Sequence, residues 1–209
     1  MGEMGLRERK RQRMYQEVSD TAVRLFLERG FDAVSVAEIA AAAGISKPTL
    51  FRYFPAKEDL VLHRIADHET EAAQVVAGQA DPVDALRRHF LAGLERRDPV
   101  TGLNDHPQVL AFHTLLYGTP ALVARAHRHQ ERAEAALARA LGGDLDARLA
   151  AGQILAVQRI LALDNWRRIA AGERVEDVAP EAVRAAERAF SRLAAGVPGL
   201  SGLSGSRAE

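Results

Sequence analysis

Hydrophobic residues recur every three or four positions along most of the chain, which is the spacing of amphipathic helices. The first stripe comprises Val18, Ala22, Leu25 and Phe26, and it ends at Gly30, a residue typical of helix C-termini. No segment alternates between hydrophobic and polar residues for long enough to indicate a strand. The pattern predicts an all-α protein of about nine helices. One ends at Gly30, and the others cover about residues 36–43, 47–54, 57–79, 82–97, 109–117, 120–141, 149–163 and 180–195.

Two short helices around a glycine turn lie between Ser35 and Leu60. Ser35 stands three residues before Glu38, which is the spacing of a capping box. Gly44 can adopt the left-handed conformation that closes the first helix, and Ser46 can cap the second. Two capped helices around such a turn are typical of a helix-turn-helix.

The second of these helices carries a surface suited to DNA. Leu50 and Phe54 are one turn apart and are expected to pack inward. The other side chains form a cationic and aromatic surface without an acidic residue: Lys47, Pro48, Phe51, Arg52 and Tyr53. Core packing of the aromatic residues is the alternative, but three aromatics within four positions cannot all face inward. We therefore expect this helix to enter the major groove of double-stranded DNA.

Residues 16–62 resemble the DNA-binding domain of the tetracycline-repressor (TetR) family of bacterial regulators. The resemblance rests on the motif AxxLFxxxGFDAVSVAEIAAAAGISKPTLFRYFPAKEDL. It implies that phosphate is contacted by Ser35, Ser46, Thr49, Tyr53 and Lys57, and that base edges are reached by Lys47, Pro48 and Phe51. Two positions depart from the family pattern: Ala37 replaces a long base-reading side chain of some members, and Ala56 replaces a common Ser or Asn cap.

Charge and composition limit the other possibilities. The 209 residues carry no net charge, so attraction to DNA must come from local placement, and all three lysines (Lys10, Lys47 and Lys57) fall near the predicted helix-turn-helix. The basic run from Arg7 to Arg13 is either an arm along the DNA backbone or minor groove, or a solvated helix start. No apolar stretch reaches the length of a membrane span, so we expect a cytoplasmic protein without a membrane partner.

No motif indicates an enzyme, a cofactor or a metal site. The chain has no cysteine, which excludes disulfides, thiolate zinc sites and cysteine nucleophiles. His63 and His68, like His127 and His129, lack the i, i+4 spacing of a helical zinc site. A nucleophile elbow and a phosphate-binding loop are also missing from the sequence. A metal-responsive regulator and a ligand-independent DNA binder are nevertheless kept as alternatives.

The C-terminal half is predicted to form dimers. Residues 149–163 are apolar nearly all the way round, so a partner surface is expected to cover them. The last predicted helix carries one stripe formed by Val183, Ala186, Phe190 and Leu193. Two such helices from each subunit would form a four-helix interface, which the family resemblance also implies. The expected domains are a DNA-binding domain with its basic arm (1–56), a ligand-binding and dimerisation domain (57–196), and a flexible tail (197–209).

The expected function is a homodimeric repressor that a small hydrophobic ligand releases from a palindromic operator. The predicted 57–79 helix would link the two halves mechanically. The expected ligand site combines apolar walls with a few polar groups: Phe90, Leu94, Leu110, His113, Tyr117, Gln158, Leu161, Asn165 and Trp166. The segment Asp164-Asn165-Trp166 is similar to family members that sense fatty acyl-CoA compounds, which makes an acyl-CoA-like effector one hypothesis.

Overall fold

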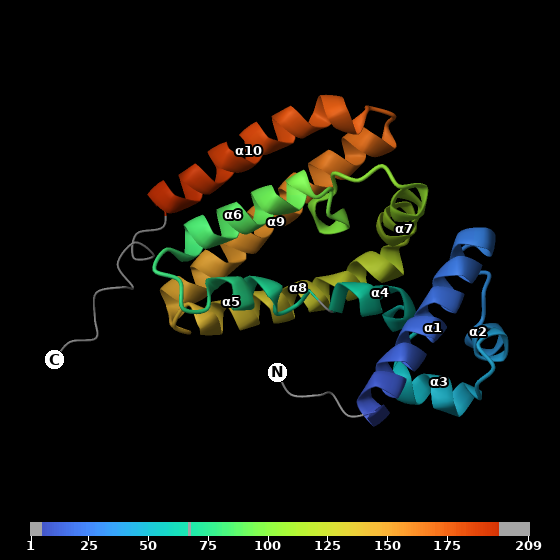
Figure 1. Ribbon diagram of the computed structural model, residues 1–209. Coiled ribbons are helices and arrows are strands. Elements are labelled where there is room, and N and C mark those ends of the chain that lie inside the picture. Colours follow the sequence, from blue (N-terminus) through green and yellow to red (C-terminus); the bar gives the residue numbers. More distant parts are fainter. Residues whose placement is uncertain (1–5, 67, 197–209) are drawn as a thin grey trace. The chain divides into compact units, whose positions relative to one another are not determined.

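The computed structural model describes residues 6–66 and 68–196, with only the backbone described for residues 6–10 and Arg64. The described residues form ten α-helices and one short 3-10 helix, η1, and they include no strand, in agreement with the all-α prediction (Figure 1). None of these helices has the length and apolar character needed to cross a membrane. The expected flexible tail, 197–209, lies outside the described residues.

The described chain divides into two compact units. The first runs to Ala66 and also contains residues 111–127. Its elements are α1 (Leu6–Arg29), α2 (Val36–Ala42), α3 (Lys47–Tyr53) and α4 (Asp59–Ala66), with most of α7 (Pro107–Gly118) and the start of α8 (Pro120–Ala140). This division differs from the expected boundary at residue 56, because α4 and a distant segment pack with the N-terminal helices.

The core of the first unit forms around the apolar stripe of α1. Phe26 is 1% exposed and contacts Phe31, with ring centroids 4.9 Å apart. The buried Ser19 hydroxyl donates a 2.7 Å hydrogen bond to the Leu60 carbonyl, which ties α1 to α4. The same cluster includes further buried residues from five other segments: Val34, Ile39, Leu50, Phe54, Leu116 and Leu122. Each of the short helices α2 and α3 therefore contributes a few side chains to a core that α1 organises.

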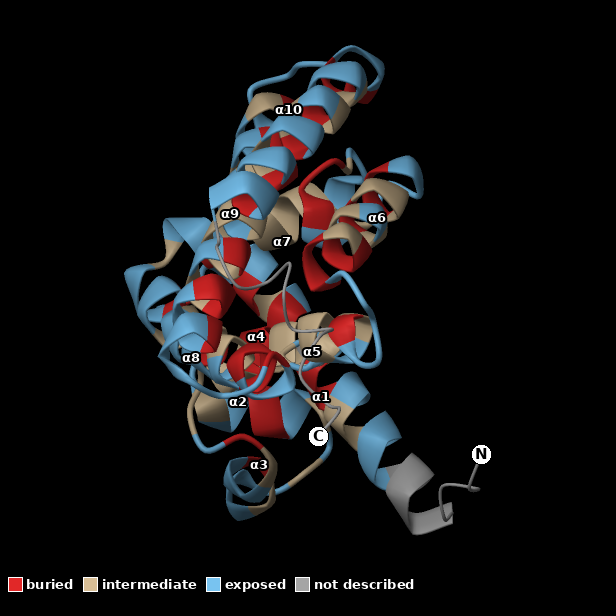
Figure 2. Ribbon diagram, turned by 90° about the vertical axis from the view of Figure 1, so that its left-hand side faces the viewer, coloured by how far each residue is buried: buried red, intermediate tan, exposed pale blue. Residues whose placement is uncertain are grey.

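The second unit consists of residues 68–110 and 128–196. Its elements are α5 (Glu71–Val76), α6 (Pro82–Glu95), η1 (Pro99–Thr101), the end of α8, α9 (Leu145–Ala170) and α10 (Val175–Gly196). Helix α10 lies along α6 and α9, and its buried residues line one side of the helix (Figures 1 and 2). Phe190 of α10 meets Phe90 of α6, with ring centroids 6.0 Å apart.

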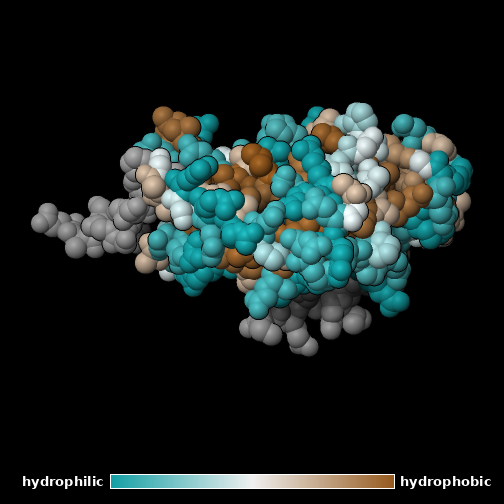
Figure 3. Space-filling view, turned by 90° about the horizontal axis from the view of Figure 1, so that it is seen from above, coloured by the Kyte–Doolittle hydropathy of each residue, from teal (hydrophilic) through white to brown (hydrophobic). Residues whose placement is uncertain are grey.

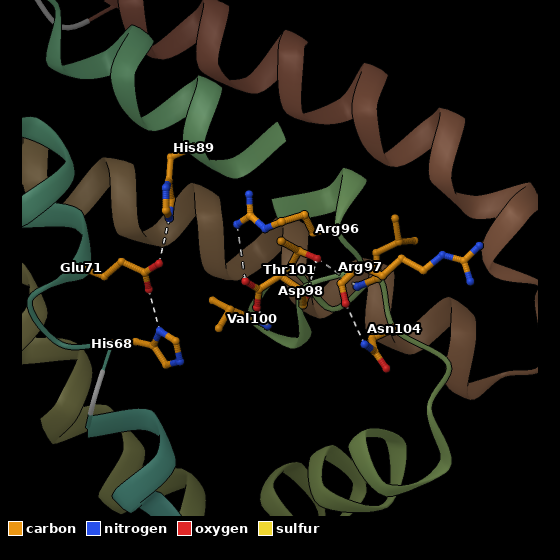
Figure 4. Close-up of polar contacts among 10 residues, drawn as sticks. His68, Glu71, His89, Arg96, Arg97, Asp98, Val100, Thr101 and Asn104 are labelled. Carbon is orange, nitrogen blue, oxygen red and sulfur yellow. Dashed lines mark hydrogen bonds and ion pairs between the residues drawn. The ribbon is translucent and has the colours of Figure 1, made fainter. Parts of the chain in front are cut away.

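The predicted long helix over residues 57–79 is wrong. The chain forms α4, which begins at Asp59, and then α5, with a turn at residues 68–70 between them. Polar side chains of this segment form hydrogen bonds with side chains of α6 and α8. Glu71 lies between His68 Nδ1 at 2.6 Å and His89 Nε2 at 2.8 Å (Figure 4), and Glu69 pairs with His129 and Arg132 of α8. The hydrogen bond from His68, followed by that from His89, lowers the pKa of Glu71 to about 2.

Helices α1, α9 and α10 begin earlier in the chain than the apolar stripes that predicted them. Helix α1 begins at Leu6, so the basic run is helical, and its role as an arm on DNA or as a solvated helix start stays a prediction. Helix α9 is longer than the expected 149–163 segment. Helix α10 begins at Val175 and contains Pro180, which had been expected at its start. Pro180 is the sixth residue of α10, beyond the first four whose N–H groups lack an intrahelical acceptor, so it removes one backbone hydrogen bond, to the Glu176 carbonyl.

A close backbone approach joins η1 to α9. Gly102 ends η1 with φ 71°, and a Cβ atom placed on it would lie 1.9 Å from the Ala162 carbonyl oxygen. The Asn165 amide donates a 2.9 Å hydrogen bond to the Thr101 carbonyl. Neighbouring loop contacts include the Asn104 amide, which donates to the Arg97 carbonyl at 2.7 Å (Figure 4). Residue 102 must be glycine for both its backbone conformation and this contact.

Gly102→Ala is expected to destabilise the protein by about 2–4 kcal/mol, because a left-handed φ and a backbone clash act together. Gly78→Ala is the matched control, since Gly78 has the same φ of +71° but no atom within 4 Å of its added Cβ. Its cost should be about 1–2 kcal/mol, from the φ strain alone. Urea unfolding of the two variants measures the difference. Equal losses would contradict the close approach between η1 and α9.

Candidate nucleic-acid interface

Helix α2 is fixed at its start by the predicted capping box. Glu38 N–H donates to Ser35 Oγ at 3.2 Å, and Ser35 N–H donates to Glu38 Oε2 at 2.8 Å. Arg29 of α1 adds a 2.7 Å ion pair to Glu38 Oε1. The backbone bond from Ser35 and then the Arg29 bond lower the pKa of Glu38 to about 2. The carboxylate therefore stays charged at neutral pH and anchors α2 to the end of α1.

Helix α3 exposes four of the five residues predicted to face outward, and the fifth, Tyr53, is half-buried. Ser46 Oγ accepts the Thr49 N–H at 3.2 Å and lies 2.8 Å from the Thr49 hydroxyl oxygen. Leu50 and Phe54 are 1% and 2% exposed, so the two predicted inward positions are confirmed. The positions on the other side of α3 are exposed (Figure 2), namely Lys47, Pro48, Phe51 and Arg52. These four side chains form what we call the recognition surface.

The recognition surface combines apolar and cationic groups. Phe51 is 41% exposed, and Lys47 Nζ lies 5.9 Å from its ring centroid. The Arg52 guanidinium carbon lies 5.3 Å from the Tyr53 ring centroid. No acidic residue lies in the first turn of α3. Two cations and an exposed aromatic on one helix are the groups that contact DNA phosphates and base edges.

Tyr53 packs against Tyr15, a residue outside the predicted site. The Tyr15 ring of α1 meets Tyr53 edge-on, with centroids 4.9 Å apart, and stacks on His63 of α4 at 5.2 Å. Tyr53 is therefore half-buried, whereas Phe51 is not. The stripe of α1 includes position 15 at the helical spacing from Val18 and Ala22, which is the signal that identifies it.

Lys57 makes internal contacts. Its Nζ donates a 2.5 Å hydrogen bond to the Phe31 carbonyl and lies 4.4 Å from the Phe31 ring centroid and 5.4 Å from that of Phe26. These contacts connect the segment after α3 to the turn between α1 and α2. The ammonium that the family resemblance assigns to phosphate thus also holds the helix-turn-helix together.

Asp59 connects α4 to α8 within the same unit. Its Oδ1 accepts Arg125 Nε at 2.8 Å, and its Oδ2 accepts Arg125 Nη2 at 2.8 Å and the Ala56 N–H at 3.0 Å. The Asp59 hydrogen bond raises the pKa of Arg125. Asp59 thereby accepts the backbone N–H of Ala56, whereas the alanine side chain itself has no oxygen to accept an N–H from the first turn of α4. Arg125 had no sequence signal, because 66 residues separate it from Asp59.

The predicted effector-site residues fall in both units. His113 and Tyr117 belong to the first unit, and burial lowers the pKa of His113. The others belong to the second unit: Phe90 and Leu94 are buried on α6, Leu110 and Leu161 pack partly against the same core, and Gln158, Asn165 and Trp166 lie on α9. The Asn165 amide bonds the Thr101 carbonyl, so its side chain supports η1.

The predicted dimer helices differ in what they leave exposed. Most of the α10 stripe packs inside the second unit, because Ala186, Phe190 and Leu193 are at most 7% exposed. Helix α9 leaves large apolar side chains uncovered: Leu145 is 65%, Leu149 55% and Ile160 56% exposed. Apolar residues also interrupt the hydrophilic surface in the space-filling view (Figure 3).

The chain is similar to known proteins. The family model for bacterial regulatory proteins of the tetR family matches residues 19–63. The chain is 33% identical over 150 residues to the HTH-type transcriptional regulator TcmR of Streptomyces glaucescens, covering 68% of this chain and 66% of TcmR. It is 40% identical over 91 residues to the putative mycofactocin biosynthesis transcriptional regulator MftR of Mycobacterium tuberculosis, covering 40% of this chain and 44% of MftR.

A solved TetR-family regulator from Streptomyces coelicolor aligns with a TM-score of 0.56, covering 91% of this chain and 99% of that chain at 22% identity. At this identity the likeness concerns the fold alone. The match extends beyond the helix-turn-helix to most of the all-helical chain.

Lys57→Met is expected to lower the free energy of unfolding by about 1–2 kcal/mol, because it removes a charged hydrogen bond and two cation–π contacts. Lys47→Met is the control, since Lys47 is exposed and its loss should cost at most about 0.5 kcal/mol. Denaturant unfolding of both variants tests this. If the two substitutions cost the same, the Lys57 ammonium does not hold the turn.

Proposed function

Because the chain belongs to the TetR family of bacterial transcriptional regulators, we propose that it is a homodimeric repressor that reads a near-palindromic operator. The recognition surface carries this proposal, since Lys47, Pro48, Phe51 and Arg52 are exposed together on α3. Leu50 and Phe54 anchor the opposite side in the core, so the surface is presented on a fixed helix.

We propose different roles for the side chains of this region. Lys47, Pro48 and Phe51 face base edges in the major groove, where lysine can bind guanine acceptors. The hydroxyls of Ser35, Ser46, Thr49 and Tyr53, with Arg52 and a free N–H of Lys57, contact phosphates. Two exposed cations are a small number for a DNA-binding surface, so apolar readout should matter for specificity.

Phe51 offers the apolar readout. Its ring has no polar atom, so it cannot hydrogen-bond a base edge. The thymine C5-methyl group is the one apolar group that the major groove displays. We propose that Phe51 contacts a thymine methyl in each half-site.

The dimer proposal is supported by α9. Leu145, Leu149 and Ile160 are exposed apolar side chains on the helix that was expected to need a partner. Burying them against a second copy would remove them from water, which is favourable. A two-fold dimer would place its recognition helices on half-sites about 34–36 Å apart, or slightly further.

Selection of duplexes from a randomised library tests the operator proposal. We expect a near-palindrome with thymine in each half-site. Replacing that thymine by deoxyuridine should weaken binding, whereas Phe51→Ala should lose about 1–3 kcal/mol and bind both duplexes equally. Leu27→Ala is the matched control, because Leu27 is also 41% exposed but lies on α1. Selection of an asymmetric single site, or of no sequence, would contradict the proposal.

We propose that the effector is a largely hydrophobic molecule with one polar or anionic end, and acyl-CoA-like compounds are the first class to test. The support is the apolar core of the second unit, with Gln158 and Trp166 partly exposed on α9. Asn165 is less available, because its amide is already bonded to Thr101.

The effector proposal predicts reciprocal coupling. An acyl-CoA that raises the melting temperature should weaken operator binding, typically by about 5–150-fold, and the operator should weaken acyl-CoA binding by the same factor. Two titrations measure this, one of operator with and without acyl-CoA and one of acyl-CoA with and without operator. An acyl-CoA that binds but leaves operator affinity unchanged does not act as an inducer.

A further inference from the structure

One carboxylate fixes the loop that follows the recognition helix. Helix α3 ends at Tyr53, and α4 begins at Asp59. Asp59 Oδ2 accepts the loop N–H of Ala56 at 3.0 Å and, at 2.8 Å, Arg125 Nη2. Asp59 Oδ1 accepts Arg125 Nε at 2.8 Å. The same side chain therefore holds the loop backbone and a guanidinium from α8.

The pair is rigid and largely shielded from water. The Asp59 side chain is 16% exposed and that of Arg125 is 23% exposed. Two parallel N–H···O bonds fix the orientation of both groups, which a single contact would not do. Leu122 on the same turns of α8 is fully buried in the core that contains Leu60. Arg125 is thus presented from a firmly packed helix.

The recognition helix depends on restraints at its ends. It is seven residues long, and Leu50 is its buried residue. A helix of this length is not stable alone, so its orientation depends on what its ends are attached to. At the C-terminal end, Tyr53 packs on Tyr15, Phe54 is buried, Lys57 bonds the Phe31 carbonyl, and the Asp59–Arg125 pair holds the loop backbone at Ala56.

A purely stabilising ion pair is the simpler reading, and most exposed pairs contribute little. Three features of this pair indicate that it also positions the loop after α3. It is bidentate, it is mostly buried, and its carboxylate also binds the loop that leaves α3. Glu58 also lies near Arg125, but the guanidinium hydrogen bonds are to Asp59.

We propose that Arg125 is a positioning residue for operator recognition. Through Asp59 it fixes the loop after α3 and thereby the orientation of the recognition surface. This inference rests on the proposed DNA-reading role of α3. It predicts that a residue far from the recognition surface in sequence controls sequence discrimination, not general DNA affinity.

The test compares two duplexes of equal length, the one that the wild-type protein selects from a randomised library and one of unrelated sequence. Binding is measured at fixed salt and well below the melting temperature of each variant. Arg125→Gln should lower affinity for the selected duplex about tenfold and change affinity for the unrelated duplex by less than about twofold, because non-specific attraction to phosphates depends less on exact orientation than base contacts do. Arg128→Gln is the control, since Arg128 is exposed on the same helix and should leave both affinities unchanged.

Further variants separate positioning from stability. Arg125→Lys keeps the charge but not the bidentate geometry, so it should lose an intermediate share of discrimination. Asp59→Asn should resemble Arg125→Gln, and the double variant should be no worse than the more affected single variant, because the two residues act as one unit.

Three results would overturn the inference. Arg125→Gln could lose affinity equally for both duplexes, or it could melt at a lower temperature and still discriminate between them. The affinity losses of the two single variants could also add up in the double variant. If Arg125→Gln does not fold, the test uses Arg125→Lys alone. A ratio of selected-duplex to unrelated-duplex affinity equal to that of the wild-type protein would then overturn the inference. If the wild-type protein selects no duplex, the proposed function fails and this inference fails with it.

Discussion

The first unit depends on burial of the α1 stripe. Helices α2 and α3 have seven residues each, too few to be stable in isolation. They persist because Ile39, Leu50 and Phe54 share a core with Val18 and Phe26 of α1. Removing these side chains from water supplies the free energy that fixes the two short helices. The outward positions of α3 are free to interact with DNA because the inward positions are fully used.

The charged side chains of the first unit act through local ion pairs and hydrogen bonds. The chain has no net charge, so no general field draws it to DNA. Several cations are committed to internal contacts: Arg29 to Glu38, Lys57 to Phe31, and Arg125 to Asp59. Lys47 and Arg52 remain on the recognition surface. The internal cations position the helices, and the external ones are available for a partner.

Helix α9 has one apolar side that packs in the core and another that is exposed. Its small residues Ala147, Ala150 and Ala151 face the core of the second unit, which allows close packing with its neighbours. Its larger residues Leu149 and Ile160 are exposed. Two different faces therefore explain why the segment is apolar nearly all the way round. One is covered within the chain, and the other is the surface that supports the proposed dimer.

The sequence by itself determined the features that depend on neighbouring residues. The capping box of Ser35 and Glu38, the left-handed Gly44, and the inward Leu50 and Phe54 were all predictable, because caps and helical spacing act over three or four positions.

The tertiary structure alone decided which polar groups meet. Lys57 and Phe31 are 26 residues apart, Asn165 and Thr101 are 64 apart, and Arg125 and Asp59 are 66 apart. The end of helix α4 also depends on distant residues, because Glu69 and Glu71 form hydrogen bonds with His129 and His89 of other helices. Helical spacing favours a continuous helix there, and no local signal reports the distant partners whose hydrogen bonds favour the turn.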